Sequence, residues 1–114
     1  MRVPIFKKGS LPEEFVTPRY SRAYGSLATG RAIEVGVLRF RAGEGAVEHS
    51  HPQEQMMYVL EGQLQVEMAG ETRILGPGEL SHMPPNVPHR VVAVGGDAVV
   101  LSCKNVVDGR GHRI

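Results

Sequence analysis

The sequence has one cysteine, no tryptophan and no long apolar run, and its charges nearly cancel. One cysteine cannot form a disulfide within the chain. No apolar run approaches the roughly 18 residues that a membrane-spanning helix needs, and the first residues lack the apolar segment of a signal peptide. We therefore expect a cytoplasmic protein with no membrane partner. The 13 basic and 12 acidic residues leave a formal charge of +1, which supplies no positive field for nucleic acid.

The length of 114 residues favours one domain, and 41% hydrophobic with 22% charged residues is typical of a globular protein. The 14 glycines and eight prolines lie between short apolar runs, as turns do between strands. Strands are predicted at residues 32–41, 56–60, 63–68, 72–75, 80–83, 91–94 and 98–103. About eight short strands at this spacing predict an all-β sandwich or barrel.

Residues 1–24 differ from the rest in holding most of the aromatic side chains. Phe6, Phe15, Tyr20 and Tyr24 lie there, together with three prolines. Aromatic side chains are costly to leave in water. We therefore expect residues 1–24 to form an N-terminal arm that packs on its own domain or on a partner subunit, and residues 25–114 to form the barrel.

The candidate metal ligands are His49, His51, Gln55 and His89. Two histidines two residues apart on a strand project from the same face, with Cα atoms roughly 7 Å apart. With a third imidazole and a side-chain oxygen they would hold one divalent transition metal and leave positions for water or substrate. A nitrogen-rich site of this kind accepts Zn, Mn, Fe, Ni or Cu, so the sequence does not choose among them.

The spacing of these residues resembles the two motifs of the small single-domain cupin family. The positions that match the motifs are Gly43, His49, His51, Gln55 and Gly62 in the first, and Gly78, Pro84, Asn86 and His89 in the second. The resemblance implies a double-stranded β-helix, or jelly-roll barrel, with one bound metal. Small cupins also pair through sheet edges and exchanged arms, so it implies a homodimer.

Three positions depart from the family pattern. Asn86 replaces a glycine, which is mild because asparagine tolerates positive φ, and Ala93 stands where the family often has asparagine. Gln55 occupies the usual position of a glutamate. A neutral amide cannot act as a general base and leaves a bound ion its full +2 charge, which favours anionic, oxygen-rich ligands. Glu54 would replace Gln55 only through an irregular turn after Pro52, since adjacent strand residues face opposite ways.

The fold does not select a function, so several remain open. The first is a metal-dependent enzyme that acts on a small oxygenated anion. Residues 51–55 resemble those of cupins that linearise unsaturated uronic sugars, which implies a sugar-acid isomerase with Arg110 binding the substrate carboxylate. Those enzymes carry an acidic residue on a late strand, and residues 101–104 contain none. The alternatives are a metal-dependent dioxygenase and a non-catalytic module that binds or senses a metal or small ligand.

The remaining candidates have structural interpretations. Tyr58 would donate a proton to a substrate or pack between the sheets. His82 is expected to be packed or hydrogen-bonded, and Cys103 to be a small buried residue. His112, in a polar tail, is expected to be exposed.

Overall fold

The computed structural model describes residues 4–113, and every regular element in that range is a β-strand. The strands are β1 (Glu14–Phe15), β2 (Tyr24–Thr29), β3 (Ile33–Phe40), β4 (Gly45–His49), β5 (Gln55–Glu61), β6 (Leu64–Met68), β7 (Glu71–Leu75), β8 (Leu80–Met83), β9 (His89–Ala93) and β10 (Ala98–Asn105). Within these residues, no helix is long and apolar enough to cross a bilayer.

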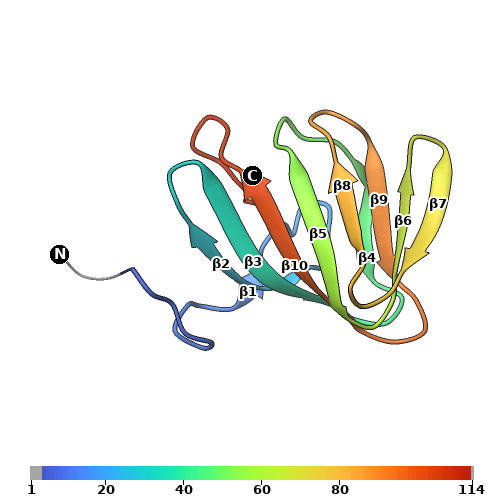
Figure 1. The fold of residues 1–114 in the computed structure, drawn as a ribbon, viewed down its shortest axis with the longest axis horizontal. Coiled ribbons are helices and arrows are strands. Elements are labelled where there is room, and N and C mark those ends of the chain that lie inside the picture. The colour runs from blue at the N-terminus through green and yellow to red at the C-terminus, as the bar shows by residue number, and fades with distance from the viewer. Residues whose placement is uncertain (1–3, 114) are drawn as a thin grey trace.

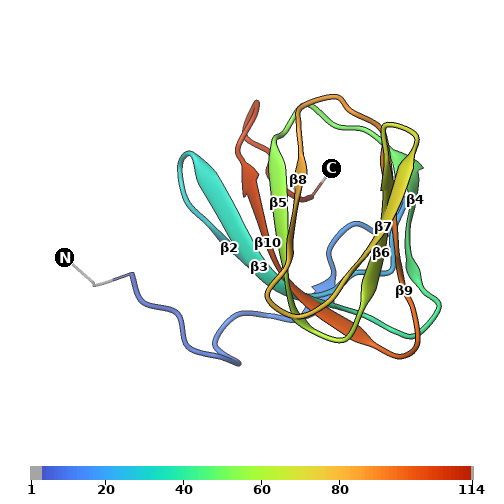
Figure 2. The same ribbon diagram turned by 45° about the vertical axis from the view of Figure 1, so that its right-hand side comes forward.

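The strands form two facing antiparallel sheets (Figures 1 and 2). One sheet has the order β1-β2-β3-β10-β5-β8 and the other the order β4-β9-β6-β7. Chain neighbours such as β3 and β4 lie in different sheets, so the chain crosses between the sheets repeatedly. The expected all-β, two-sheet architecture is therefore confirmed.

The core lies between the sheets and follows from alternation along the strands. On β10, Ala98 and Val100 point inward and are fully buried, and Ser102 and Lys104 continue the same face. On β5, Gln55 begins an inward face that Met57 and Val59 continue. Each of these two strands therefore ends its apolar inward face with polar groups at the same end of the barrel.

The outward side of the six-stranded sheet carries exposed apolar side chains, which we call the outer apolar face. Its members are Ile33, Val37, Met56, Tyr58, Leu60 and Leu80. The strand register places Val37, Leu101, Tyr58 and Leu80 in one row across β3, β10, β5 and β8. Tyr58 therefore lies on the outside of the barrel and does not pack between the sheets.

The N-terminal segment divides into two parts. Residues 4–10 are exposed, and part of this segment, from Phe6 to Gly9, lines an open groove with Tyr24 and Val37 on the outward side of the six-stranded sheet. Residues 16–23 lie against β4, because the backbone N–H groups of Arg22 and Val47 donate to the carbonyls of Gly45 and Tyr20 at 3.0 Å. Val16 and Ala23 belong to the hydrophobic core. The second half of the predicted arm is thus an integral part of this chain's own barrel.

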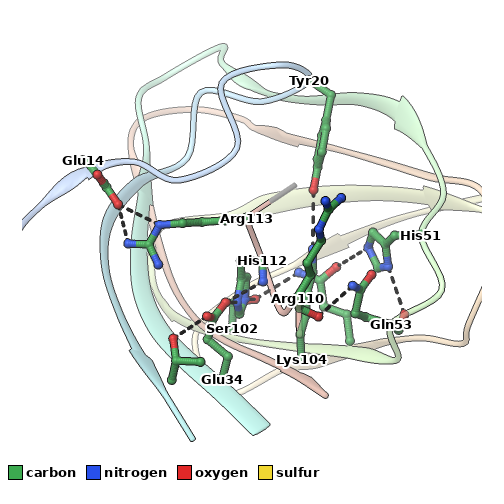
Figure 3. A network of polar contacts seen from close by, with 12 residues as sticks. Glu14, Tyr20, Glu34, His51, Gln53, Ser102, Lys104, Arg110, His112 and Arg113 are labelled. Carbon is green, nitrogen blue, oxygen red and sulfur yellow. Dashed lines mark hydrogen bonds and ion pairs between the residues drawn. The ribbon is translucent and has the colours of Figure 1, made fainter. Parts of the chain in front are cut away.

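The C-terminal tail folds back onto the end of β10. Val107 and Arg110 form an isolated antiparallel bridge, after which His112 enters the interior with 2% of its surface exposed. The prediction of an exposed His112 is therefore wrong: Glu34 supplies a buried partner that the local sequence around His112 does not reveal. The guanidinium of Arg113 pairs with Glu14, so the tail also contacts β1 (Figure 3).

Candidate metal centre

Three histidines converge from separate parts of the chain on one point between the sheets. His49 ends β4, His51 lies two residues further, and His89 begins β9. A bulge in the β4–β9 pairing sets His49 directly opposite His89. The ligand atoms of the three rings lie within 4.8 Å of one another. The predicted convergence of these three side chains is therefore present in the fold.

The loop that carries His51 is held by the proline-rich loop before β9. The backbone N–H of Asn86 donates to the carbonyl of His51 at 2.8 Å. Asn86 adopts a φ of 64°, in the left-handed region where the family pattern has glycine. Asparagine is among the residues that adopt this conformation most readily, so the departure at this position preserves the turn.

Each of the three histidines forms the same hydrogen bond through Nδ1. The acceptors are the carbonyls of Val47, Gln53 and Val87, at 2.7, 2.9 and 3.0 Å from Nδ1 of His49, His51 and His89 respectively. A carbonyl only accepts, so Nδ1 carries the ring hydrogen and Nε2 keeps a free lone pair. Metal-binding histidines in proteins are commonly oriented in this way. Nε2 of His89 is buried and has no hydrogen-bond partner within the described part of the chain, as expected for an atom that binds a cation.

Gln55 contributes an oxygen to the same point. Its Oε1 lies 3.1 Å from Nε2 of His51, and its Nε2 donates to Oγ of Ser102 at 3.0 Å. In this arrangement a carbonyl oxygen and an imidazole lone pair face each other with no hydrogen between them. A shared cation relieves that contact, so the three imidazoles and the Gln55 oxygen fit a divalent transition metal.

Burial keeps the three imidazoles in the neutral form that binds a metal ion. Burial lowers the pKa of His49 and of His51 to about 4, although their backbone hydrogen bonds oppose the shift. Burial also lowers the pKa of His89. Metal binding requires neutral imidazole, and the rings are therefore neutral at pH 7 without help from the ion.

A lysine and a tyrosine close the site from the other side. The Tyr20 ring stacks on His49 with ring centroids 3.9 Å apart, and Nζ of Lys104 donates to the Tyr20 hydroxyl at 3.5 Å (Figure 3). Lys104 is 3% exposed. Burial lowers the pKa of Lys104 to about 8, and the carboxylate of Glu34 opposes part of that shift.

The cavity lined by these groups is small. Its volume is about 20 Å³, and its walls include Tyr20, His49, Gln55, His89 and Lys104. A single water needs roughly 10 to 15 Å³ of such space. The structure therefore has room beside the histidines for little more than one or two water-sized groups.

Comparison with known proteins identifies the family. The profile of the cupin domain matches residues 36–104, which is more than half of the chain and includes all four candidate metal ligands. The chain belongs to the cupin family.

Solved cupin structures share the fold. KdgF from Halomonas sp. superposes with a TM-score of 0.79 at 24% identity, covering 91% of this chain and 94% of that one. An RmlC-like cupin from Shewanella frigidimarina gives a TM-score of 0.80 at 18% identity, covering 94% of each chain. These similarities confirm the jelly-roll barrel.

A relative in sequence covers a smaller region. The protein called polyketide synthase CurC from Streptomyces cyaneus is 39% identical over 62 residues, which are 54% of this chain. The match spans 40% of the length of that relative.

The two residues predicted to bind substrate do not lie among the ligands of this cupin. Tyr58, 39% exposed, is on the opposite face of β5 from Gln55. Arg110 is exposed in the C-terminal tail, and its carbonyl accepts a hydrogen bond from Nε2 of Gln53 at 2.9 Å. The tail of this cupin thus contacts the loop that holds His51, with the Arg110 side chain in the same close-up (Figure 3).

Other polar residues have local partners. The Glu54 side chain points away from Gln55, and its Oε2 lies 2.6 Å from Nε2 of His82 on the exposed side of the sheet. Cys103 is half-buried, because it alternates with inward-facing Ser102 and Lys104.

Sequence reasoning missed the polar residues that surround the ligands. Ser102 and Lys104 follow Val100 on the inward face of β10, and alternation alone places them there. Lys104 is the direct partner of Gln55 in the β10–β5 register. Alternation also places Glu34 on the inward face of β3, with Leu38 and Phe40. His112 carries no such signal, since it contacts Glu34 only after the C-terminal tail has folded back.

Proposed function

We propose that this cupin is a metal-dependent enzyme that acts on a small oxygenated anion, with an unsaturated sugar acid as the substrate class to test first. The observation that carries the proposal is a cluster of three convergent imidazoles, two of which, His49 and His89, line one cavity with the buried ammonium of Lys104. A divalent ion bound there would act as a Lewis acid that stabilises an enolate.

Lys104 gives the proposed site a preference for anions. Among residues 4–113, its ammonium makes a single hydrogen bond, the 3.5 Å contact with Tyr20, although an ammonium has three donors. A buried charge with so few partners favours a ligand that supplies negative oxygens. A carboxylate bound by Lys104 would lie next to the ligand histidines, which places the adjacent carbons of a sugar acid within reach of the metal.

The 20 Å³ cavity is too small for a sugar acid, so the proposal requires the cover to move. The cover is the Tyr20 side chain, carried by residues 16–23. Displacement of Tyr20 uncovers His49 and frees Lys104 from its hydroxyl partner. Arg110, exposed on the neighbouring tail, is the proposed second contact for a substrate carboxylate once the site is open.

The experiment begins with protein purified without a metal-chelating column. Its metal content is measured by elemental analysis, and several unsaturated uronates are then mixed with the metal-loaded protein while the absorbance of their double bond is followed. We expect loss of absorbance with the wild type and no loss with His89→Ala. The control is His82→Ala, which removes an exposed histidine outside the site and is expected to keep full activity.

A second function is favoured by two observations. The cavity is too small for a sugar acid, and residues 101–104 of β10 include no acidic residue of the kind that the uronate-linearising cupins carry on a late strand. Both are typical of a module that binds a metal or small ligand without turnover. A bound metal with no reaction across the uronates would support this module and contradict the isomerase.

The polyketide synthase relative adds one further arm to the assay. Like a sugar acid, a β-diketone offers two oxygens to one cation and forms an enolate. A simple β-diketone is therefore included beside the uronates. Turnover of the diketone, with no turnover of any uronate, would support an enzymatic function and contradict a sugar acid as the substrate class.

A further inference from the structure

A chain of buried hydrogen bonds runs from Gln55 to a carboxylate on β3. It passes through Ser102 and His112 and ends on Glu34 (Figure 3). Ser102 and His112 are 0% and 2% exposed, and Glu34 is 3% exposed. These three residues lie outside the histidine cluster, yet the first hydrogen bond of the chain is donated by the candidate metal ligand Gln55.

Glu34 fixes the direction of the chain because it only accepts. Its Oε2 accepts from the Thr29 hydroxyl at 2.5 Å, and its Oε1 accepts from Nδ1 of His112 at 2.6 Å and from the backbone N–H of the same residue. Burial raises the pKa of Glu34, but these hydrogen bonds outweigh it and the net shift is downward. The carboxylate is therefore ionised and holds the ring hydrogen of His112 on Nδ1.

The next two bonds follow from that hydrogen. Burial lowers the pKa of His112 to about 4, so the ring is neutral and its Nε2 carries a lone pair. Nε2 accepts from the hydroxyl of Ser102 at 2.8 Å. Ser102 has a single hydrogen, so towards Gln55 its oxygen accepts, from the amide NH₂ at 3.0 Å.

We infer that Ser102 and His112, anchored on Glu34, are positioning residues that orient the Gln55 carboxamide with its oxygen towards the ligand histidines. The inference rests on the proposed metal site. If the amide were reversed, its NH₂ would face the metal and its oxygen would need the hydrogen that Ser102 gives to His112. Nε2 of His112 would then be a buried acceptor with no partner, which is costly.

The test is a double-mutant cycle on zinc affinity, measured by competition with a chromophoric chelator. Ser102→Ala frees the amide, and His112→Phe frees the serine hydrogen to donate to the Gln55 oxygen. Loss of such outer contacts typically weakens metal binding by about 10- to 100-fold, and we expect a loss in that range for each variant. In a Gln55→Ala background the same changes are expected to have no effect, because no amide remains to be oriented.

Matched controls separate positioning from general damage. Ser81→Ala removes another buried inward-facing serine, whose hydroxyl donates to the sulfur of Met83 at 3.5 Å, and it is expected to leave zinc affinity unchanged. If the His112→Phe variant does not fold, the cycle is measured with Ser102→Ala and Gln55→Ala. Equal losses with and without Gln55, or no loss in either, would overturn the inference.

A second measurement does not depend on metal binding. Nitrogen-15 chemical shifts of His112 in metal-free wild-type protein report which ring nitrogen carries hydrogen. Hydrogen on Nδ1 with a bare Nε2 supports the chain of bonds, and hydrogen on Nε2 overturns it. If the wild type binds neither zinc nor cobalt, the proposed function fails, while this readout still tests the orientation of the chain.

Discussion

Acid should unfold the metal-free protein at a higher pH than is usual for a domain of this size. The histidines responsible are His49, His51, His89 and His112, each with a pKa lowered chiefly by burial. In the unfolded chain their pKa is near 6.5. Between pH 6.5 and about 4 the unfolded state therefore binds more protons than the folded state, and the free energy of unfolding falls as the pH falls.

The magnitude follows from the two most buried histidines with a defined pKa. His51 and His112 are 4% and 2% exposed, and the pKa of each is lowered to about 4. Each adds a slope of about 1.4 kcal/mol per pH unit inside that window. Together they give about 3 kcal/mol per unit, so two pH units remove a large part of the 5 to 15 kcal/mol that is typical of a domain.

The assay is urea unfolding in EDTA at half-unit steps from pH 7.5 to 4.5. We expect a plateau above pH 7 and a steep loss of stability below pH 6.5. His112→Phe should reduce the slope by about one proton, because it removes one of the histidines whose pKa is lowered by burial. A free energy of unfolding that is constant between pH 6.5 and 5 would refute the assignment of neutral, buried imidazoles.

Three further perturbations test the cover, the outer surface and the ligand set. Tyr20→Ala should speed the release of bound metal to a chelator by several-fold, because a stacked aromatic pair contributes about 0.5 to 1.5 kcal/mol. Tyr24→Ala, which changes an exposed tyrosine, is the control. Equal release rates from the two variants would contradict a covering role for Tyr20. We propose that the homodimer implied by the resemblance to small cupins also buries the outer apolar face, because large exposed apolar patches commonly mark interfaces. Val37→Glu should then convert the dimer to a monomer in light scattering, and a monomeric wild type would contradict the dimer. Gln55→Glu should tighten zinc binding while weakening acetate binding to the cobalt-loaded protein, and tighter acetate binding would contradict the role given to Lys104.

Most strands could be predicted because their side chains alternate. The runs that became β5, β6, β8 and β10 were located to within a few residues. β2 was missed, since its sequence is rich in small residues with weak strand preference. Gly25 is required there by tertiary packing, because an added Cβ would lie 2.1 Å from the carbonyl oxygen of Val37. No pattern local to β2 carries that information.

The ligand residues could be predicted because their spacing is a property of the chain itself. His49, His51 and Gln55 lie within one short stretch, and the second motif points to His89. The surroundings of the ligands come from the two ends of the chain, which meet only in the folded barrel. Tyr20 reaches the site from the N-terminal segment and His112 from the C-terminal tail, so their roles depend on contacts that no sequence spacing predicts.

The neutral ligand at position 55 is explained by its neighbour. Gln55 and Lys104 are direct partners on β5 and β10, and both point into the barrel. A glutamate at position 55 would pair with that ammonium and raise its pKa above the present value of about 8. The pair would be internally neutral, and the net positive charge around a bound ion would be one unit lower. With glutamine, the carboxylate of Glu34, the direct partner of Lys104 on β3, offsets one positive charge, and the charge of a bound ion stays uncompensated. The exchange of one acidic ligand for its amide thus adds one unit of positive charge to the site and strengthens its preference for an anionic ligand.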